Sequence, residues 1–537
     1  MNARRNIWGW GLADRFWDRE ARAAFGAGLI DQLGFAPPAL LDPLPLDQAE
    51  IPESRVKAQA PLDLLMRSDR ESRALHTYGR GYRDLVRGFV GDYSSAPDLV
   101  AYPQSEADIA QILAWAADER FAVTPYGGGT SVVGGVEGPP RSQFPGVISL
   151  DLSRLDRVQR VDQTSRAALI EAGANGPRLE AQLARHKLTL RHYPQSFEFS
   201  TLGGWIATRA AGHYATHRTR IDDFVESIRM ITPSGLFQTR RLPSSGAGPS
   251  PDRFALGSEG IFGVITEAWM RVSERPGYRA RAVLSFSGFL EAAEAARAIV
   301  QSGLLPSNLR VLDPLEARMN AVRADGRAVM LLAFESADHS MAANVQRAVE
   351  LARASGGLLD REPKVEEPSS SAPDPEQTDA ERWRGAFFDA PYLQNVMVSL
   401  GVVADTFETA CTWDRFPELY AGVRAELSRA MKEVAGAGAI SCRLTHVYPD
   451  GPAPYFTFVF PGGAGGLLGA WAEIKTAASE TIARMGATIT HHHAVGRLHR
   501  PWYDRERPEV FAEVLRAAKR TLDPRGILNP GVLIDPL

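Results

Sequence analysis

The side chains best suited to acid–base chemistry gather near the C-terminal end of this sequence. Four of its eleven histidines lie within nine residues: His491, His492, His493 and His499. Neutral imidazoles make good proton shuttles near pH 7. Side chains alternate in an extended segment, so we expect His491 and His493 to share one face while His492 points away. At most two of the three would then meet one substrate directly.

A histidine triplet is also typical of a surface tract or a metal-binding tract. Histidines that bind a metal usually donate their second ring nitrogen to a carboxylate or a carbonyl group. No Asp or Glu lies beside this stretch. We therefore predict that the triplet does not form a metal site.

A second chemical signal is the glycine stretch 127–129, which follows the apolar run 121–123. Consecutive glycines permit positive φ angles and a close approach of a ligand to the backbone. Successive N–H groups in such a turn can form a concavity for an anion such as a pyrophosphate. Most triple glycines are plain loops, however. The usual nucleotide-binding signatures are absent, because the sequence has no G-x-G-x-x-G and none of its six lysines follows a glycine.

Further segments raise the significance of this stretch: 195–205 is rich in hydroxyl groups, and 208–212 and 257–267 contain more glycine turns. Together with 97–103, they resemble in order and spacing the flavoproteins of the vanillyl-alcohol oxidase and p-cresol methylhydroxylase superfamily. This resemblance implies a two-part α+β domain that binds FAD without the Rossmann fingerprint. Some relatives attach FAD to a histidine where this chain has Thr130, so we expect non-covalent FAD. The cofactor-binding residues implied are Pro125, Tyr126, Gly127, Gly128, Gly129, Thr130, Ser131, Gln195, Ser196, Phe197, Glu198, Phe199, Ser200, Thr201, Gly204, Thr208, Arg209, Ala210, Ala211, Gly257, Ser258, Glu259, Gly260, Ile261, Phe262, Gly263 and Ile265.

A narrower resemblance begins at the histidine triplet. Residues 491–498 are similar to the H-H-H-G-V-G signature of alkyldihydroxyacetonephosphate synthases, and residues 8–11, 405–409, 413–415 and 442–448 match as well. These flavoenzymes exchange the acyl chain of acyl-dihydroxyacetone phosphate for a long-chain alcohol, without net redox change. In the course proposed for them, the substrate loses a proton at C1, flavin N5 displaces the fatty carboxylate, and the alcohol attacks the resulting adduct.

The same resemblance implies roles for individual residues. The active-site acid/base tyrosine of these synthases falls on Tyr455. His492 would be the leading proton acceptor, and His491 and His493 would orient the reacting groups. Arg310 would be catalytic and would contact substrate, because a planar guanidinium can bond two oxygens of a phosphate or carboxylate.

Departures from the family pattern concern anion binding. Gln394 stands where relatives have a substrate-contacting arginine, and we expect it at the substrate site with weaker anion recognition. Arg218 or Arg220 could compensate. The alternative function is an FAD-dependent 2-hydroxyacid oxidase or dehydrogenase of the same superfamily. Those enzymes commonly carry H-x-G-D-G-N-x-H, whereas the stretch from His446 to Tyr455 has no second histidine.

The fold must bring these distant residues together. The chain has 537 residues, of which 44% are hydrophobic and 23% charged, enough for several cores. Short β-branched runs alternate with amphipathic stretches, which predicts an α+β class. The predicted parts are an N-terminal helical region (1–96), a two-subdomain FAD-binding domain of the p-cresol methylhydroxylase type (97–276), an α+β cap or substrate domain (277–495) and a C-terminal segment that completes the FAD and active site (496–537). Helical spacing covers 60–86, 106–118 and 510–522, strand-like runs cover 147–150, 328–334 and 455–460, and the acidic Pro/Ser-rich segment 360–378 is expected to be a flexible loop.

Composition limits the partners. The chain has 60 basic and 64 acidic residues, a net charge of −4, which does not suit a nucleic-acid binder. Its two cysteines indicate a reducing compartment, and no apolar run is long enough to span a bilayer. We expect a cytoplasmic enzyme for a small-molecule lipid, or for a keto or hydroxy acid. The aromatic segment 8–17 is compatible with peripheral membrane contact or with ordinary packing, and the family resemblance is compatible with a homodimer.

Overall fold

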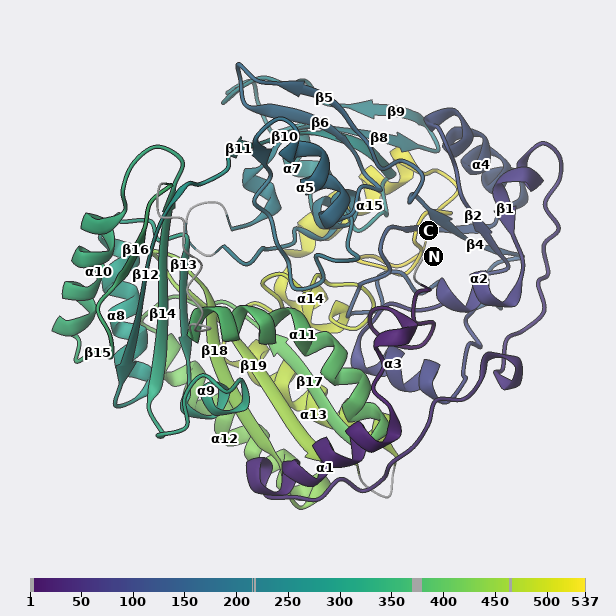
Figure 1. Cartoon of the computed structure of the whole chain (residues 1–537). Coiled ribbons are helices and arrows are strands. Elements are labelled where there is room, and N and C mark those ends of the chain that lie inside the picture. Colours follow the sequence, from purple (N-terminus) through teal and green to yellow (C-terminus); the bar gives the residue numbers. More distant parts are fainter. Residues whose placement is uncertain (1–3, 215, 217–218, 369–378, 463–465, 537) are drawn as a thin grey trace.

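The computed structural model describes residues 4–214, 216, 219–368, 379–462 and 466–536. Within these residues the chain forms sheets of four, five and eight strands and a two-stranded ribbon, with helices packed around them. Figure 1 shows the smaller sheets in the upper and right-hand part of the molecule and the eight-stranded sheet in the lower left part. The predicted α+β class is confirmed.

The N-terminal region consists of short elements. They are η1 (Ala13–Arg15), α1 (Arg19–Leu33), η2 (Leu46–Gln48), η3 (Leu62–Leu65), β1 (Met66–Arg67), α2 (Arg70–Leu75) and α3 (Tyr82–Phe89). The helical spacing over 60–86 is therefore broken into pieces. Between α2 and α3, a Cβ on Gly79 would lie 2.0 Å from the carbonyl oxygen of Ser131, and one on Gly81 would lie 2.6 Å from that of Val132. This close backbone contact interrupts the helix and supports the loop that follows the triple glycine.

The four-stranded sheet carries the glycine stretch at the end of a strand. Its strands β2 (Leu99–Ala101), β3 (Ala122–Tyr126) and β4 (Val147–Asp151) join β1 in the order β1-β2-β4-β3. The helix α4 (Glu106–Glu119) connects β2 to β3, and β4 pairs with both in parallel. Because β3 ends at Tyr126, residues 127–131 emerge at the carboxyl edge of parallel strands, where such sheets usually bind ligands.

The five-stranded sheet shares a core with the first. Its strands are β5 (Val158–Asp162), β6 (Ala167–Glu171), β8 (Val225–Thr232), β9 (Gly235–Gln238) and β10 (Val264–Arg271), in the order β5-β6-β10-β8-β9. Around it lie α5 (Gly176–Ala184), α6 (Leu202–Thr208), η4 (Ile221–Asp223), α7 (Pro251–Ala255) and the ribbon of β7 (Leu188–Thr189) with β11 (Ser273–Glu274). Apolar side chains such as Ile148, Ile228 and Leu202 belong to one buried cluster. That cluster holds the glycine stretch and the start of α6 at a fixed separation.

The eight-stranded sheet provides the opposite wall of the site. Its strands are β12 (Tyr278–Phe286), β13 (Asn308–Leu312), β14 (Ala328–Ser336), β15 (Leu358–Leu359), β16 (Lys364–Glu366), β17 (Val402–Glu408), β18 (Ala439–Val447) and β19 (Pro452–Pro461), in the order β15-β12-β14-β13-β18-β19-β17 with β16 beside β12. The associated helices are α8 (Phe289–Gln301), α9 (Pro314–Met319), α10 (Ala342–Ala354), α11 (Asp379–Ser399), α12 (Phe416–Ala435) and α13 (Leu467–Arg484).

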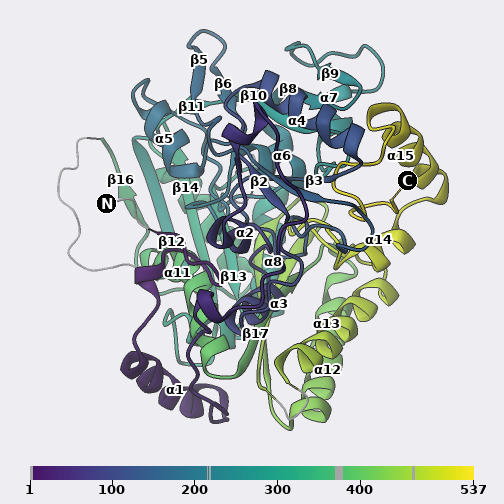
Figure 2. The ribbon, with the colours of Figure 1, turned by 90° about the vertical axis from the view of Figure 1, so that its right-hand side faces the viewer.

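Alternation along β19 shows how this sheet divides its two faces. Phe456, Phe458 and Phe460 are fully buried in the core that α8, α12 and α13 share with the sheet. Successive side chains of a strand point to opposite faces, so Tyr455 and Thr457 point the other way. Figure 2 shows α12 and α13 side by side along one flank of the molecule. The face that carries Tyr455 is thus turned away from these helices.

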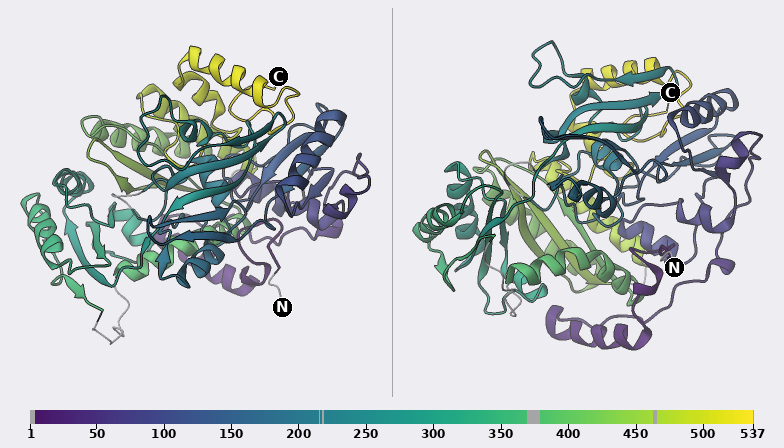
Figure 3. Two further views of the ribbon diagram at one scale, coloured as in Figure 1. Left: turned by 90° about the horizontal axis from the view of Figure 1, so that it is seen from above. Right: turned by 45° about the horizontal axis from the view of Figure 1, so that its top comes forward.

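The C-terminal segment returns to the first sheet. After α14 (Arg500–Glu506) and α15 (Glu509–Leu522), the N–H of Val123 donates to the carbonyl of Ile527, and the N–H of Asn529 donates to the carbonyl of Val123. The buried Lys519 ammonium donates to the carbonyls of Ile261 and Leu528. Figure 3 shows α15, in yellow, lying next to the five-stranded sheet. The last residues therefore complete the half of the protein that carries the glycine stretch.

Candidate functional site

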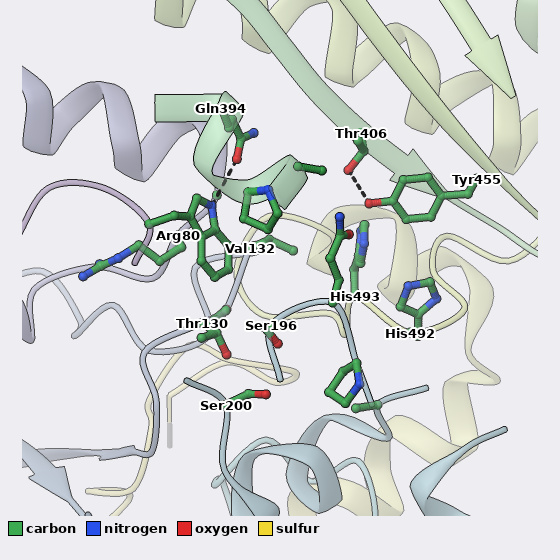
Figure 4. A pocket seen from close by; sticks show the side chains of 18 of the residues that line it. Arg80, Thr130, Val132, Ser196, Ser200, Gln394, Thr406, Tyr455, His492 and His493 are labelled. Carbon is green, nitrogen blue, oxygen red and sulfur yellow. Dashed lines mark hydrogen bonds between the residues drawn. The ribbon is translucent and has the colours of Figure 1, made fainter. Parts of the chain in front are cut away.

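A cavity of about 360 Å³ lies between the glycine stretch and the eight-stranded sheet. Pockets of several hundred Å³ are the usual size for cofactor and small-molecule sites. Figure 4 shows Thr130, Ser196 and Ser200 on one side of this cavity, Gln394 at another side, and Thr406, Tyr455, His492 and His493 together opposite. Residues that are far apart in the sequence thus face one common space.

The glycine stretch contributes backbone rather than side chains to the cavity wall. A Cβ on Gly128 would lie 2.0 Å from the carbonyl oxygen of Phe199, and one on Gly127 would lie 2.2 Å from the hydroxyl of Thr201. Gly129 has a φ of +67°. Among the described residues, the N–H groups of residues 127–129 have no hydrogen-bond acceptor. Three backbone donors therefore remain available for a ligand, as a phosphate-binding turn requires.

The second loop lines the cavity with hydroxyl groups and the start of a helix. Thr201 caps α6 by accepting a hydrogen bond from the N–H of Gly204. Ser200 is held by the indole N–H of Trp205, at 2.7 Å. The predicted cofactor residues that line the cavity are Gly127, Gly128, Gly129, Thr130, Ser131, Gln195, Ser196, Ser200, Thr201, Gly204, Thr208, Ala210 and Ala211.

The other predicted cofactor residues do not line this cavity. Pro125, Tyr126, Phe197, Glu198, Phe199 and Arg209 flank the lining residues, and Gly257, Ser258, Glu259, Gly260, Ile261, Phe262, Gly263 and Ile265 lie behind them. Ile261 and Phe262 are buried in the core, and a Cβ on Gly260 would lie 3.0 Å from Pro125. The turn before β10 therefore supports the glycine stretch from behind. A direct contact of these residues with cofactor stays a prediction.

Tyr455 stands on the sheet wall with its hydroxyl donating to the hydroxyl of Thr406, at 2.9 Å. The guanidinium of Arg443 lies over the Tyr455 ring at 3.9 Å from its centroid, and Arg443 pairs with the buried carboxylate of Glu316. Burial raises the pKa of Tyr455, while Arg443 opposes that rise. Tyr455 is therefore protonated at neutral pH, beside a cation that would stabilise its anion.

Glu408, at the end of β17, organises the histidine segment. One carboxylate oxygen accepts hydrogen bonds from the N–H groups of His492 and His493 and from the Thr490 hydroxyl, and the other accepts from the N–H of His491. Three N–H groups that converge on one carboxylate force the segment to curve. The predicted alternation is therefore wrong: His492 and His493 line the cavity together, and His491 does not.

Charge states in this cluster follow from burial and hydrogen bonding. Burial lowers the pKa of His491, His492 and His493 below its usual range, so the imidazoles are neutral at pH 7. Burial alone would raise the pKa of Glu408, but the histidines and Thr490 hold it well below the usual range. The backbone donors account for this physically, because a carboxylate that accepts several N–H bonds stays ionised.

A second histidine contact reaches the triplet from β18. Nε2 of His446 lies 2.8 Å from the carbonyl oxygen of Gly212, and nitrogens of His446, His491 and His492 all lie within 4.8 Å of one another. That spacing would allow a shared metal ion. However, Nδ1 of His491 is already hydrogen-bonded to Nδ1 of His492 at 3.0 Å. We therefore describe the cluster as a hydrogen-bonded network, and the absence of a metal site stays a prediction.

Two predicted substrate-binding residues are occupied by the protein itself. Gln394 lines the cavity, but its amide accepts from the indole of Trp10 and donates to the carbonyl of Ala404. Arg310, on β13, is fully buried, does not line the cavity, and bonds the ring and carbonyl of His213. Burial lowers the pKa of Arg310 to about 9. Because Arg310 has no contact with the cavity, its catalytic or substrate-binding role stays a prediction.

Of the two arginines proposed to compensate for Gln394, only Arg220 is among the described residues. Arg220 donates to the carbonyl of His491 at 2.6 Å, so it supports the triplet from behind. Arg218 lies outside the described residues. Trp8 packs edge-on against Phe16 and Phe89, and Trp10 is buried. These contacts favour the packing interpretation of the aromatic N-terminal segment.

Comparison with known proteins identifies the family. The family model described as "FAD binding domain" matches residues 97–240, and "FAD linked oxidases, C-terminal domain" matches residues 275–533. An alkyldihydroxyacetonephosphate synthase of Dictyostelium discoideum is 30% identical over 481 residues, 87% of this chain and 78% of that protein. This chain belongs to the alkyldihydroxyacetonephosphate synthase family. The predicted family and the FAD cofactor are thereby confirmed.

Two further comparisons concern the fold and a more distant relative. A solved structure of an alkyldihydroxyacetonephosphate synthase shares the fold, with a TM-score of 0.79 at 24% identity over 98% of each chain. A mitochondrial D-lactate dehydrogenase of Arabidopsis thaliana is more distant, at 25% identity over 451 residues, 82% of this chain and 74% of that protein.

Within the described residues, no helix has both the length and the apolar character needed to cross a membrane.

The residues present fit FAD, as this synthase family requires. Free backbone donors at 127–129 and the hydroxyls of Thr130, Ser196 and Ser200 suit the pyrophosphate. Thr130 cannot form the link to flavin that a histidine makes, so non-covalent binding stays the prediction. Sequence reasoning gave no role to Glu408, Arg443, Thr406 or Tyr448. The one available signal was that all four residues lie in the segments 405–409 and 442–448, which match the family.

Proposed function

We propose that the protein is an FAD-dependent synthase that exchanges the acyl chain of acyl-dihydroxyacetone phosphate for a long-chain alcohol. The observation that carries the proposal is the cavity itself. It sets Tyr455, His492 and His493 opposite the backbone and hydroxyl donors of the FAD loops. Family membership supports the same reaction, because the relative named above is an alkyldihydroxyacetonephosphate synthase.

Tyr455 and the cavity-lining histidines each have a role in this proposal. The neutral His492 accepts the proton that leaves C1 of the substrate. Tyr455, protonated and next to Arg443, donates a proton to the departing carboxylate oxygen and takes one from the entering alcohol. Bound FAD supplies a nucleophilic ring nitrogen. Glu408 fixes the backbone that carries the histidines, and His493 orients the reacting groups from the same wall.

The apolar side of the cavity suits a fatty chain. Val132, Met319, Met397 and Val459 contribute to its lining, and most of the lined surface is apolar. Phosphate recognition falls to two cations that line the cavity, Arg443 on β18 and Lys475 on α13, because Gln394 is held by Trp10 and Ala404. Both cations have carboxylate neighbours, Glu316 and Asp405. We therefore expect weaker anion binding than an arginine at position 394 would give.

Further parts of this proposal concern organisation. We propose an N-terminal region at 1–96, an FAD-binding domain at 97–276, a cap domain at 277–495 and a completing segment at 496–537. The change from β11 to β12 falls between the second and third of these parts. The predicted flexible loop 360–378 is wrong in part, because Lys364–Glu366 form β16 and pair with β12, while residues 369–378 lie outside the described residues. Homodimer formation and peripheral membrane contact stay predictions.

A substrate comparison under anaerobic conditions tests the function. The holoenzyme is mixed with acyl-dihydroxyacetone phosphate plus a long-chain alcohol, and separately with 2-hydroxy acids. The synthase predicts an ether product and release of fatty acid, with the oxidised flavin spectrum preserved at the end. Bleaching of the flavin by a hydroxy acid without any ether product would instead establish the oxidase or dehydrogenase alternative.

A further inference from the structure

A chain of hydrogen bonds leads away from the cavity behind His492. Nδ1 of His492 lies 3.0 Å from Nδ1 of His491, and Nε2 of His491 lies 2.7 Å from the Tyr448 hydroxyl. The Tyr448 hydroxyl lies 3.1 Å from the hydroxyl of Thr219. Two consecutive links within hydrogen-bond distance therefore join the cavity-lining imidazole of His492 to the phenol of Tyr448, and a third continues to Thr219.

Tyr448, the group before Thr219 in this chain, also belongs to the lining of a second, more open cavity. Tyr448 lines it together with Cys411, Thr412, Arg415 and Asp450. This cavity measures about 350 Å³, and Asp450 and Thr412 are exposed at its wall. His491 lines neither cavity and is buried between them. The links from His492 to Tyr448 thus connect a residue that lines the substrate space with a residue that lines the second cavity.

Every group in the chain can both donate and accept a hydrogen bond. A neutral imidazole has one N–H and one lone pair, and a hydroxyl has both functions. Burial lowers the pKa of His491 and His492 well below the usual range and raises the pKa of Tyr448 to about 12, so all three are neutral. Since Nδ1 of His492 faces His491, Nε2 is the nitrogen left for the substrate.

We propose that His492, His491 and Tyr448 form a proton relay that carries the substrate C1 proton from the cavity to the second cavity. The inference rests on the proposed function, since it supplies the exit for the proton that His492 accepts. Nε2 of His492 gains the proton, its Nδ1 proton passes to Nδ1 of His491, and the Nε2 proton of His491 passes to the Tyr448 oxygen. The Tyr448 proton then passes to water in the second cavity, and no electrons are transferred.

Two neighbouring contacts hold the relay in line. Arg220 donates to the carbonyl of His491, at 2.6 Å, and Glu408 accepts the N–H of His491, at 2.6 Å. The backbone of His491 is therefore fixed on both sides, which keeps its two ring nitrogens directed at His492 and Tyr448. His446 lies beside the relay, with its ring centroid 5.0 Å from that of His491 and 5.4 Å from that of His492. Its Nε2 is hydrogen-bonded to the carbonyl oxygen of Gly212 and not to a relay residue.

The fate of a deuterium label at substrate C1 tests the relay. The wild-type holoenzyme, acting on C1-deuterated substrate and a long-chain alcohol in ordinary water, should lose label to solvent and give an ether with little deuterium at the abstracted position. In Tyr448→Phe the exit is broken, so the label should return to carbon. The ratio of retained to lost label should rise by about tenfold or more, while FAD affinity is unchanged.

Two further variants guard against a merely structural effect. Thr412→Phe should fill the second cavity from its rim and raise label retention without touching a relay residue. Tyr420→Phe, which removes a hydroxyl bonded to Arg424 away from the relay, should behave as wild type. Equal label retention in wild type, Tyr448→Phe and Thr412→Phe would overturn the relay. Absence of ether product from the wild type would instead overturn the proposed function.

Discussion

The hydroxyl of Tyr455 is the group in this protein best placed to move a proton at the substrate oxygens. It donates to Thr406, its ring lies under Arg443, and its pKa is raised mainly by burial. We predict that Tyr455→Phe lowers kcat by roughly 10²–10⁴-fold, which is the usual contribution of a positioned acid or base to the rate. The FAD spectrum and affinity should be unchanged. Steady-state kinetics measure this effect, and Tyr503→Phe, outside the cavity, is the control. Near-normal turnover of Tyr455→Phe would remove Tyr455 from the mechanism.

Glu408 supports a second residue-level prediction. In Glu408→Gln, an amide NH₂ would face N–H groups that now donate to a carboxylate. We predict a loss of about 1–3 kcal/mol in unfolding free energy, the cost of an unsatisfied buried partner, and a clear fall in kcat/KM because the histidines lose their alignment. Denaturant unfolding and kinetics measure both effects. Glu418→Gln, at an exposed position, is the control. Equal unfolding free energy and equal kcat/KM in the two variants would contradict the role of Glu408.

Single residues show where sequence reasoning succeeds and where it fails. Tyr455 could be located from the family register, and the structure places it on the cavity wall. The expected alternation of side chains fails at His491 to His493. Glu408 lies 83 residues before His491 in the sequence and bends the segment by accepting its backbone N–H groups. Arg310 lies fully buried beside His213, and its expected contact with substrate stays a prediction. Long-range partners of this kind leave no mark in the local pattern.

At the scale of elements, the triple glycine works by letting two loops touch. A Cβ on Gly128 would meet the carbonyl group of Phe199 at 2.0 Å, and a backbone neighbour cannot move aside cheaply. We predict that Gly128→Ala weakens FAD binding at least about tenfold and destabilises the protein by about 1–3 kcal/mol. Calorimetric titration with FAD and thermal unfolding give the two readouts.

A matched glycine provides the control for this prediction. A Cβ on Gly469, in α13, would have no atom within 4 Å, so Gly469→Ala should bind FAD normally and be slightly more stable. Equal FAD affinity in both variants would show that the close contact at Gly128 does not shape the cofactor site.

Regular elements with a clear period were predictable from the sequence. The expected helices at 106–118 and 510–522 and the expected strands at 147–150 and 328–334 correspond to α4, α15, β4 and β14. The predicted helix over 60–86 is only partly right, since this stretch forms short pieces. Gly79 and Gly81 lie against the backbone of another loop and interrupt the helix. Apolar periodicity reports burial on one face of an element, but it does not report contacts between loops.

At the scale of the whole molecule, Glu259 joins the two halves that form the site. Its carboxylate accepts the N–H groups of Val495 and Gly496, just after the histidine triplet. Burial raises the pKa of Glu259 to about 7, against the opposing effect of those N–H groups. A carboxyl group with a raised folded-state pKa stabilises most at low pH, and this contribution is lost as the pH rises from about 4.5 through about 7.

We predict that the difference in Tm between wild type and Glu259→Gln depends on pH. The wild type should gain stability relative to the variant as the pH falls from about 8 to about 5, because only the wild type takes up a proton there. Thermal unfolding of both proteins across this range, at constant ionic strength and saturating FAD, checks the sign. A constant difference, or one that shrinks toward low pH, would contradict the raised pKa.

We propose that one cavity holds FAD, Tyr455 and the histidines, and that a carbon–oxygen bond of the substrate is replaced there without net oxidation. Mass spectrometry of the product formed from acyl-dihydroxyacetone phosphate and an alcohol labelled with heavy oxygen tests this most directly. We expect an ether that carries the heavy oxygen, with one fatty acid released for each ether formed. An unlabelled product, or no ether from an enzyme that has bound FAD, would contradict it.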